Sequence, residues 1–238
     1  MALDAVIFDW GGTLTPWHTI DLREQWAAYT RVREPTRADE LAGLLLEAET
    51  DAWAAAREHQ RSGTIDEIFR SVGLEPSGEL HEQALAAYHE FWTPHTLIDP
   101  EVPPLFIALR ERGIRVGVLS NTLWTRDYHE AVFRRDGVLE LVDGAVYSSE
   151  IPYTKPHPEA FAAAMNAVGA DDPARVVFVG DRPYDDIHGA KAVGMRAVLV
   201  PHSAIPRDQG GHSEGEPDAV IQRLADLLPI VDEWNRRT

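Results

Sequence analysis

The sequence of 238 residues contains no cysteine and only two lysines, Lys155 and Lys191. The absence of cysteine excludes disulfide bonds, thiolate metal sites and thiol nucleophiles together. The chain carries a formal net charge of −17. It therefore lacks the clustered positive charge that binding to a nucleic-acid backbone requires.

Long apolar runs are also missing. No stretch approaches the roughly 18 residues that a membrane-spanning helix needs, and residues 1–4 lack the basic start of a signal peptide. We therefore expect a cytoplasmic protein, monomeric or homodimeric, without membrane or nucleic-acid partners. With 44% hydrophobic and 26% charged residues, the chain is large enough for one α/β domain and a smaller insertion.

The first third of the chain changes from a strand pattern to helical spacing. The apolar run 5–8 ends at Asp9 and two glycines follow, which is typical of a buried strand and a tight turn. Beyond it, apolar residues recur only at helical spacing. This predicts an all-helical domain at residues 15–99, with helices over 21–33, 37–60, 64–72 and 79–92.

The rest of the chain alternates helices with strands. The pattern predicts helices over 101–112, 125–136, 158–168 and 186–193. It predicts strands over 114–119, 144–147, 175–179 and 196–200. A loop over 201–217 and a last helix over 218–228 would follow. Together with residues 1–14, residues 100–238 would form an α/β core domain with a doubly wound parallel sheet and right-handed crossovers.

Polar segments follow the apolar runs of this core, where parallel sheets bind their ligands. Each segment alone has a simpler explanation as a helix cap, a solvated lysine or an acidic helix start. The segments are Asp9–Leu14, Ser120–Asn121, Thr154–Pro158 and Gly180–Ala190. Taken together and in this order, they resemble the four motifs of the haloacid dehalogenase superfamily. The helical block after the first motif resembles the cap of its small-molecule phosphatases, phosphonatases and 2-haloacid dehalogenases.

This resemblance implies a Rossmann-like core and a Mg²⁺-dependent phosphatase that acts on a small phosphorylated metabolite. Asp9 would be the nucleophile and would carry an aspartyl-phosphate intermediate. Ser120 would bind a phosphoryl oxygen, and Lys155 would stabilise the negative charge shared by nucleophile and phosphate.

Further site residues also follow from the resemblance. Mg²⁺ prefers hard oxygen ligands. The implied metal ligands are Asp9, the carbonyl of Gly11, Asp181 and either Asp186 or Asp185, a choice that the spacing leaves open. The implied substrate-binding residues are Gly12, Thr13 and Asn121.

Gly11 departs from the family pattern, because phosphatases of this kind usually carry an aspartate there as general acid and base. Loss of such a group typically costs about 10²–10⁴-fold in rate. One interpretation is a slow phosphatase, or one restricted to good leaving groups, assisted by water or by His18. Another is a 2-haloacid dehalogenase, since a halide leaves without a proton. An acid at position 181 argues against this, because such enzymes use no metal to screen it.

Two further alternatives concern the same departure. A phosphonatase would need a lysine in the cap, and none occurs between residues 14 and 154. A non-catalytic phosphate-binding or regulatory protein would not need a nucleophile at Asp9.

Several aromatic residues fall in or near the helical block, and their spacing predicts a cap core rather than substrate contacts. They are Trp17, Trp26, Tyr29, Trp53, Tyr88, Phe91 and Trp92.

Overall fold

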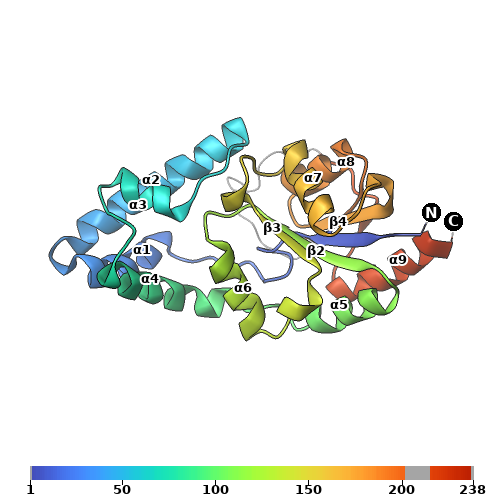
Figure 1. Ribbon diagram of the computed structural model, residues 1–238, viewed down its shortest axis with the longest axis horizontal. Coiled ribbons are helices and arrows are strands. Elements are labelled where there is room, and N and C mark those ends of the chain that lie inside the picture. The colour runs from blue at the N-terminus through green and yellow to red at the C-terminus, as the bar shows by residue number, and fades with distance from the viewer. Residues whose placement is uncertain (1, 202–214, 237–238) are drawn as a thin grey trace.

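The computed structural model describes residues 2–201 and 215–236, and within them the chain forms a six-stranded sheet beside a block of helices (Figure 1). All strands are parallel, in the order β3-β2-β1-β4-β5-β6. The strands are β1 (Ala5–Phe8), β2 (Arg115–Ser120), β3 (Gly144–Tyr147), β4 (Val176–Gly180), β5 (Arg196–Leu199) and β6 (Ala219–Val220). The predicted parallel α/β sheet is confirmed.

The register of the three central strands aligns their carboxyl ends. Phe8 of β1 pairs with Val118 of β2 and with Val179 of β4. Every residue of β1 and β4 is buried, as expected for strands covered by helices on both faces. The residues that directly follow these pairs therefore meet at one edge of the sheet.

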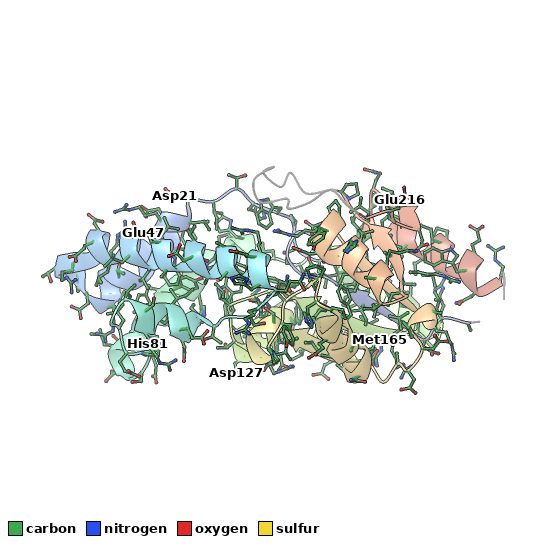
Figure 2. The ribbon with its side chains drawn as sticks, turned by 90° about the horizontal axis from the view of Figure 1, so that it is seen from above. Asp21, Glu47, His81, Asp127, Met165 and Glu216 are labelled. Atoms are coloured by element: carbon green, nitrogen blue, oxygen red, sulfur yellow. The ribbon has the colours of Figure 1, made fainter. Side chains whose placement is uncertain are left out.

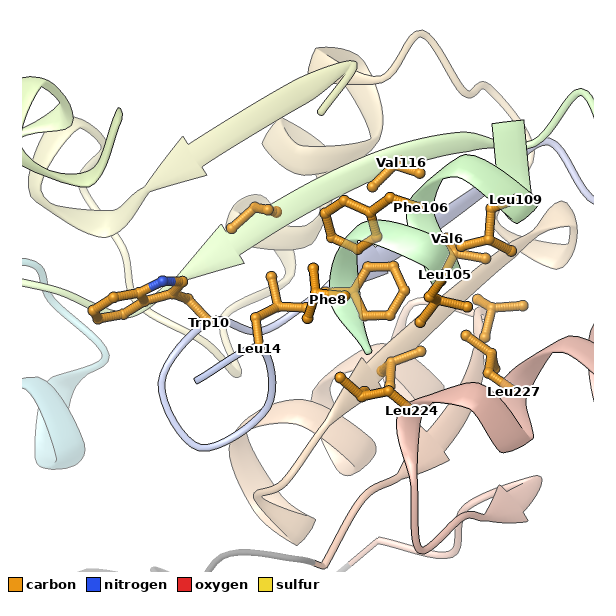
Figure 3. Packing of buried hydrophobic residues seen from close by; sticks show 14 of the residues in the cluster. Val6, Phe8, Trp10, Leu14, Leu105, Phe106, Leu109, Val116, Leu224 and Leu227 are labelled. Carbon is orange, nitrogen blue, oxygen red and sulfur yellow. The ribbon is translucent and has the colours of Figure 1, made fainter. Parts of the chain in front are cut away.

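Helices cover both faces of the sheet, so the doubly wound arrangement is confirmed. One face packs against α5 (Val102–Glu111), α6 (Arg126–Arg135) and α9 (Leu227–Arg236). The rings of Phe8 and Phe106 lie 5.2 Å apart in this layer, and Figure 3 shows them among its leucines and valines. The other face packs against α7 (Pro158–Ala167) and α8 (Gly189–Ala192).

The helical block has a hydrophobic core of its own, separate from the two layers on the sheet. It consists of α1 (Leu22–Arg33), α2 (Ala38–His59), α3 (Ile65–Ser71) and α4 (Glu79–Trp92). Each begins and ends within about one residue of the predicted bounds. Figure 2 shows the block and the sheet with its helices following one another along the length of the molecule. The division into two domains at residues 15–99 stays a prediction.

Two predicted helices differ in the structure. Residues 183–188 form a π-helical turn ahead of α8 because the carbonyl of Arg182 accepts from the amides of both Asp186 and Ile187. The expected helix over 218–228 is wrong. Residues 219–220 form the edge strand β6, anchored where the Asp218 carboxylate accepts from the backbone of Ala197, and α9 begins only at residue 227.

Two other expectations concern loops and membranes. Most of the expected loop at 201–217 lies outside the described residues. Within the part of the chain that the structure describes, no helix is both long and apolar enough to cross a membrane.

Candidate active site

The strand ends bring Asp9, Lys155 and Asp186 into direct contact. Lys155 Nζ donates to Asp9 Oδ1 at 2.5 Å and to Asp186 Oδ1 at 2.7 Å. All three side chains are buried, with residue exposures of 3% for Lys155, 7% for Asp9 and 0% for Asp186. The predicted nucleophile therefore shares its lysine partner with a second carboxylate.

The side chain of Asn121, just beyond β2, fixes the backbone of Lys155. Its Nδ2 donates to the Lys155 carbonyl at 3.0 Å, and its Oδ1 accepts from the Lys155 amide at 2.8 Å. The side chain of Asn121 was predicted as a substrate contact. It lines the cavity described below, but these two bonds make it a positioning residue for the lysine.

Asp181 completes the cluster from the end of β4. Ligand oxygens of Asp9, Asp181 and Asp186 all lie within 4.8 Å of one another. Asp181 is 5% exposed, and among the described residues neither of its carboxylate oxygens has a hydrogen-bond partner. A buried, unsatisfied carboxylate is costly unless a cation binds it. Three carboxylates facing one lysine thus form a site suited to a divalent cation.

Local electrostatics supports the same conclusion. Burial and the charges of Asp9 and Asp186 raise the pKa of Asp181 well above its ordinary value. Burial also raises the pKa of Asp9, although the charge of Lys155 opposes this. Burial alone would lower the pKa of Lys155, but the charges of Asp186 and Asp9 raise it above its ordinary value. The lysine therefore stays protonated, and the acids resist simultaneous ionisation until another cation arrives.

The backbone after β4 determines which acid of the fourth motif reaches the site. Asp186 Oδ2 accepts from the Arg182 amide at 2.9 Å, which holds its carboxylate over the end of the strand. A Cβ on Gly180 would lie only 2.3 Å from that carboxylate, so this close approach requires glycine. Asp185 lies outside the cluster of three acids, and burial, reinforced by the charge of Asp186, raises its pKa to about 6. The sequence left open which acid serves the metal; the structure places Asp186 in the cluster.

The turn after Asp9 combines an open position with a constrained one. Gly11 lines the cavity, and a Cβ built on it would meet no atom within 4 Å. Gly12 has φ +88°, in the left-handed region, and its amide donates to the Thr15 carbonyl at 2.9 Å. Thr13 is fully buried, is not among the residues that line the cavity, and its hydroxyl has no partner among the described residues. The backbone N–H of Thr13, which the resemblance assigns to the phosphate cradle, donates to the Trp10 carbonyl at 3.4 Å in this structure, and its substrate contact stays a prediction.

A cavity of about 580 Å³ lies between the carboxyl edge of the sheet and the helical block. At the sheet end it is lined by Asp9, Ser120 and Lys155, and Ser120 is itself 2% exposed. His18 also lines it, with its ring 5.4 Å from that of His95. At the opposite end the walls are aromatic. Trp26, Trp53, Tyr88 and Trp92 contribute to the lining there. Trp17 and Trp124 line the cavity nearer the sheet, where Trp17 lies under the Arg182 guanidinium and Trp124 packs against Trp10.

Comparison with known proteins agrees with this arrangement. A family model described as haloacid dehalogenase-like hydrolase matches residues 3–194. The chain belongs to the haloacid dehalogenase-like hydrolases. It is accordingly a hydrolase, and the resemblance seen in its four motifs is confirmed.

Individual members of this hydrolase family are similar over most of the chain. A glyceraldehyde 3-phosphate phosphatase of Methanopyrus kandleri is 30% identical over 71% of each chain. Among solved structures, a phosphatase of the family from Thermococcus onnurineus has a TM-score of 0.67 at 23% identity, covering 96% of this chain and 98% of that one. The L-2-haloacid dehalogenase of Xanthobacter autotrophicus has a TM-score of 0.60 at 21% identity, covering 97% and 98%. These two structures establish the fold alone.

Sequence reasoning missed two features of the cavity. One is the pairing of Asn121 with the Lys155 backbone, which depends on segments 34 residues apart. The other is a group of hydrogen-bonded aromatic residues around Glu49 of α2. No motif indicated it, because a single glutamate on an amphipathic helix looks like any solvated residue.

Proposed function

We propose that this protein is a Mg²⁺-dependent phosphatase that hydrolyses a small phosphate monoester through a covalent intermediate on Asp9. The observation that carries the proposal is the buried cluster of three carboxylates, Asp9, Asp181 and Asp186, held around one lysine. The phosphatase name of the relative from Methanopyrus kandleri supports the same reaction.

The cluster fits the metal on chemical grounds. Mg²⁺ binds carboxylates and carbonyl oxygens and keeps several waters. The two oxygens of Asp181, which have no partner among the described residues, are ligands of this kind. Asp9, Asp181 and the Gly11 carbonyl would hold it, with Asp186 close enough to contribute. When bound, Mg²⁺ supplies the positive charge that allows a phosphate dianion to approach a carboxylate.

The chain's own residues then account for two displacements. In the first, a carboxylate oxygen of Asp9 attacks phosphorus, and the bond from phosphorus to the leaving alcohol oxygen breaks. Lys155 stabilises the negative charge on the transferring group, and the Ser120 hydroxyl donates to one of its oxygens. In the second, water attacks phosphorus, the bond to Asp9 breaks, and inorganic phosphate is released with the carboxylate restored.

Gly11 limits this reaction at the leaving group. The departing alkoxide needs a proton, and glycine at position 11 has no side chain to give one. The protein should therefore hydrolyse acyl phosphates and aryl phosphates, whose leaving groups need little protonation, faster than alkyl phosphates. Water or His18 would assist with the poorer leaving groups.

A 2-haloacid dehalogenase would use the same nucleophile without a metal. The buried carboxylate of Asp181 is unfavourable for that reaction, because it would repel both Asp9 and the carboxylate of the substrate. We therefore favour the phosphatase.

The test is turnover of acetyl phosphate, p-nitrophenyl phosphate and 2-chloropropionate, with Mg²⁺ and with chelator. We expect hydrolysis of the two phosphates only with Mg²⁺, loss of turnover in Asp9→Asn, and no chloride release. Chloride release that is independent of Mg²⁺ would establish the dehalogenase instead.

Metal binding itself can be measured without turnover. Mg²⁺ should raise the unfolding temperature of the wild type, because a ligand that binds only the folded state stabilises it. Asp181→Ala should abolish most of that rise. An unchanged rise in this variant would remove Asp181 from the metal site.

A further inference from the structure

The end of the cavity toward the helical block is built by a continuous hydrogen-bond network. Gln25, fully buried on α1, donates from Nε2 to Glu49 Oε2 at 2.6 Å, and its Oε1 accepts from Tyr88 Oη and Trp92 Nε1. Trp26 Nε1 donates to the same Glu49 oxygen at 2.8 Å. We call Trp26, Tyr88, Trp92 and Trp124 the aromatic wall.

The aromatic wall has its polar atoms occupied within this network. Trp124 Nε1 donates to Tyr88 Oη at 2.9 Å, so each indole N–H and the phenol already has a partner. All four rings line the cavity. Trp26 and Tyr88 are 1% exposed and support the wall from behind, so a ligand would meet mainly the aromatic carbon of the half-buried rings of Trp92 and Trp124. Such surfaces attract cations and hydrocarbon, and they offer few hydrogen bonds.

Glu49 is the charged group in the midst of these rings. It lines the cavity, and among the described residues no lysine, arginine or histidine forms an ion pair with it. Burial raises the pKa of its carboxyl above the ordinary value. Hydrogen bonds from Trp26, Trp53 and Gln25 favour the ionised form and oppose this rise. A partly buried carboxylate without a counter-ion carries a desolvation cost. A cation entering the cavity would relieve that cost.

The position of Glu49 along α2 separates it from the phosphate site. The helix ends beside Lys155, where the Gln60 carbonyl accepts from the Thr154 amide at 3.0 Å. Glu49 lies ten residues before His59, which is about 15 Å along a helix axis. Arg57 lies near the Lys155 end of the same helix and lines the cavity too. The cavity thus has cationic side chains toward its phosphate end and a carboxylate among aromatic rings toward the other.

We propose that Glu49 and the aromatic wall bind an organic ammonium group, carried by the substrate at the end opposite its phosphate. The substrate class is then the phosphate monoester of an alkylammonium alcohol, with its anionic end at Asp9 and its ammonium group directed toward the aromatic wall and Glu49. An alkylated ammonium suits the site best, because the wall offers π-surface in place of hydrogen-bond acceptors. This assignment rests on the proposed phosphatase function of the same cavity.

The experiment compares phosphocholine with 3,3-dimethylbutyl phosphate, which has the same shape with carbon in place of the charged nitrogen. For the wild type we expect kcat/KM for phosphocholine to exceed that for the neutral ester by about tenfold or more, as expected for a cation over aromatic rings beside a carboxylate. In Glu49→Gln the ratio should fall to about one, because the amide keeps the shape and loses the charge. Phosphoethanolamine as a third substrate separates a primary from a quaternary ammonium.

Glu47→Gln is the matched control, since Glu47 lies on the same helix, is exposed and does not line the cavity. It should leave the ratio unchanged. Equal turnover of the two esters by the wild type would overturn the ammonium site and leave the phosphatase intact. An equal loss for both esters in Glu49→Gln would also overturn it, because that pattern indicates a structural role.

A binding measurement decides the inference even if no phosphate is hydrolysed and the proposed function fails. Choline, titrated calorimetrically against 3,3-dimethylbutan-1-ol, should bind the wild type more tightly than the neutral alcohol and should lose this advantage in Glu49→Gln. No preference for choline would overturn the site. If Glu49→Gln does not fold, the wild-type comparisons of the two esters and of the two alcohols still decide it.

Discussion

The two ends of the cavity organise buried polar groups in opposite ways. At the sheet edge, charges face one another, and Asp181 keeps two unpartnered oxygens within the described residues. At the helical end, neutral donors and acceptors satisfy one another around the single carboxylate of Glu49. In each place an amide side chain positions the charged residue: Asn121 holds the backbone of Lys155, and Gln25 holds the side chain of Glu49.

The difference indicates what each end requires from a ligand. A cluster with excess negative charge is incomplete without a cation, so its stability and its chemistry depend on the metal. A network whose neutral groups satisfy one another keeps its fold without a ligand, and its one carboxylate without a counter-ion selects a cation beside it. The comparison can be tested by removing one member from each end.

Lys155→Met should have the largest effect. Removing the cation leaves Asp9 and Asp186 buried without their partner, which typically costs about 3–5 kcal/mol in unfolding free energy. Urea denaturation without metal measures it. Lys191→Met is the control, because Lys191 pairs with Asp218 at the surface, where such pairs are worth about 1 kcal/mol or less. Equal losses in the two variants would show that the buried cluster has no special dependence on its lysine.

Gly11→Asp should restore the missing acid and raise hydrolysis of alkyl phosphates by about 10²-fold, within the usual contribution of a general acid. A side chain at this position meets no neighbouring atom within 4 Å. Gly12→Asp is the control, because it adds the same carboxylate one residue further along, at a position whose φ of +88° strains any side chain. Steady-state rates with alkyl and aryl esters give the comparison. A folded Gly11→Asp protein without any gain on alkyl esters would rule out the missing acid as the limit.

Gln25→Met should destabilise the helical block by about 2 kcal/mol. The change leaves Tyr88 and Trp92 without their acceptor and Glu49 without one donor, and each unsatisfied buried group costs about 1–3 kcal/mol, partly offset by the apolar replacement. Gln83→Met on the exposed face of α4 is the control. Thermal unfolding followed by tryptophan fluorescence reports the change. A loss no larger than that of the control would mean that the network adds little to stability.

His129→Gln should have the smallest effect near neutral pH, and its consequence is a changed pH dependence of stability. Burial, aided by the charge of Arg126, lowers the pKa of His129 to about 3, below the value of about 6.5 in an unfolded chain. The unfolded state therefore binds the proton first, and the wild type loses up to about 1.4 kcal/mol per pH unit as pH falls from about 6.5 toward 3. The variant should lose less over this range in urea titrations. Parallel pH profiles would contradict the assignment of a buried neutral imidazole.

Local patterns in the sequence predicted the sheet, the first four helices and the family of the protein. Apolar runs ending in Asp9, Ser120 and Asp181 are local features, and the parallel topology brings their ends together. The choice between Asp185 and Asp186 was not predictable, because it depends on a π-helical turn set by the Arg182 carbonyl. The last helix was misplaced because the edge strand at 219–220 forms only by pairing with β5, a distant contact.

The backbone pairing between the end of α2 and the segment before Lys155 has a mechanical consequence. The Thr154 amide donates to the Gln60 carbonyl, and the Ser62 amide donates to the Pro152 carbonyl at 3.1 Å. A swing of α2 away from the sheet must either rupture this short backbone tether or pull the loop at 152–155 along with it. In the second case, the movement that opens the cavity to a substrate also draws Lys155 away from Asp9.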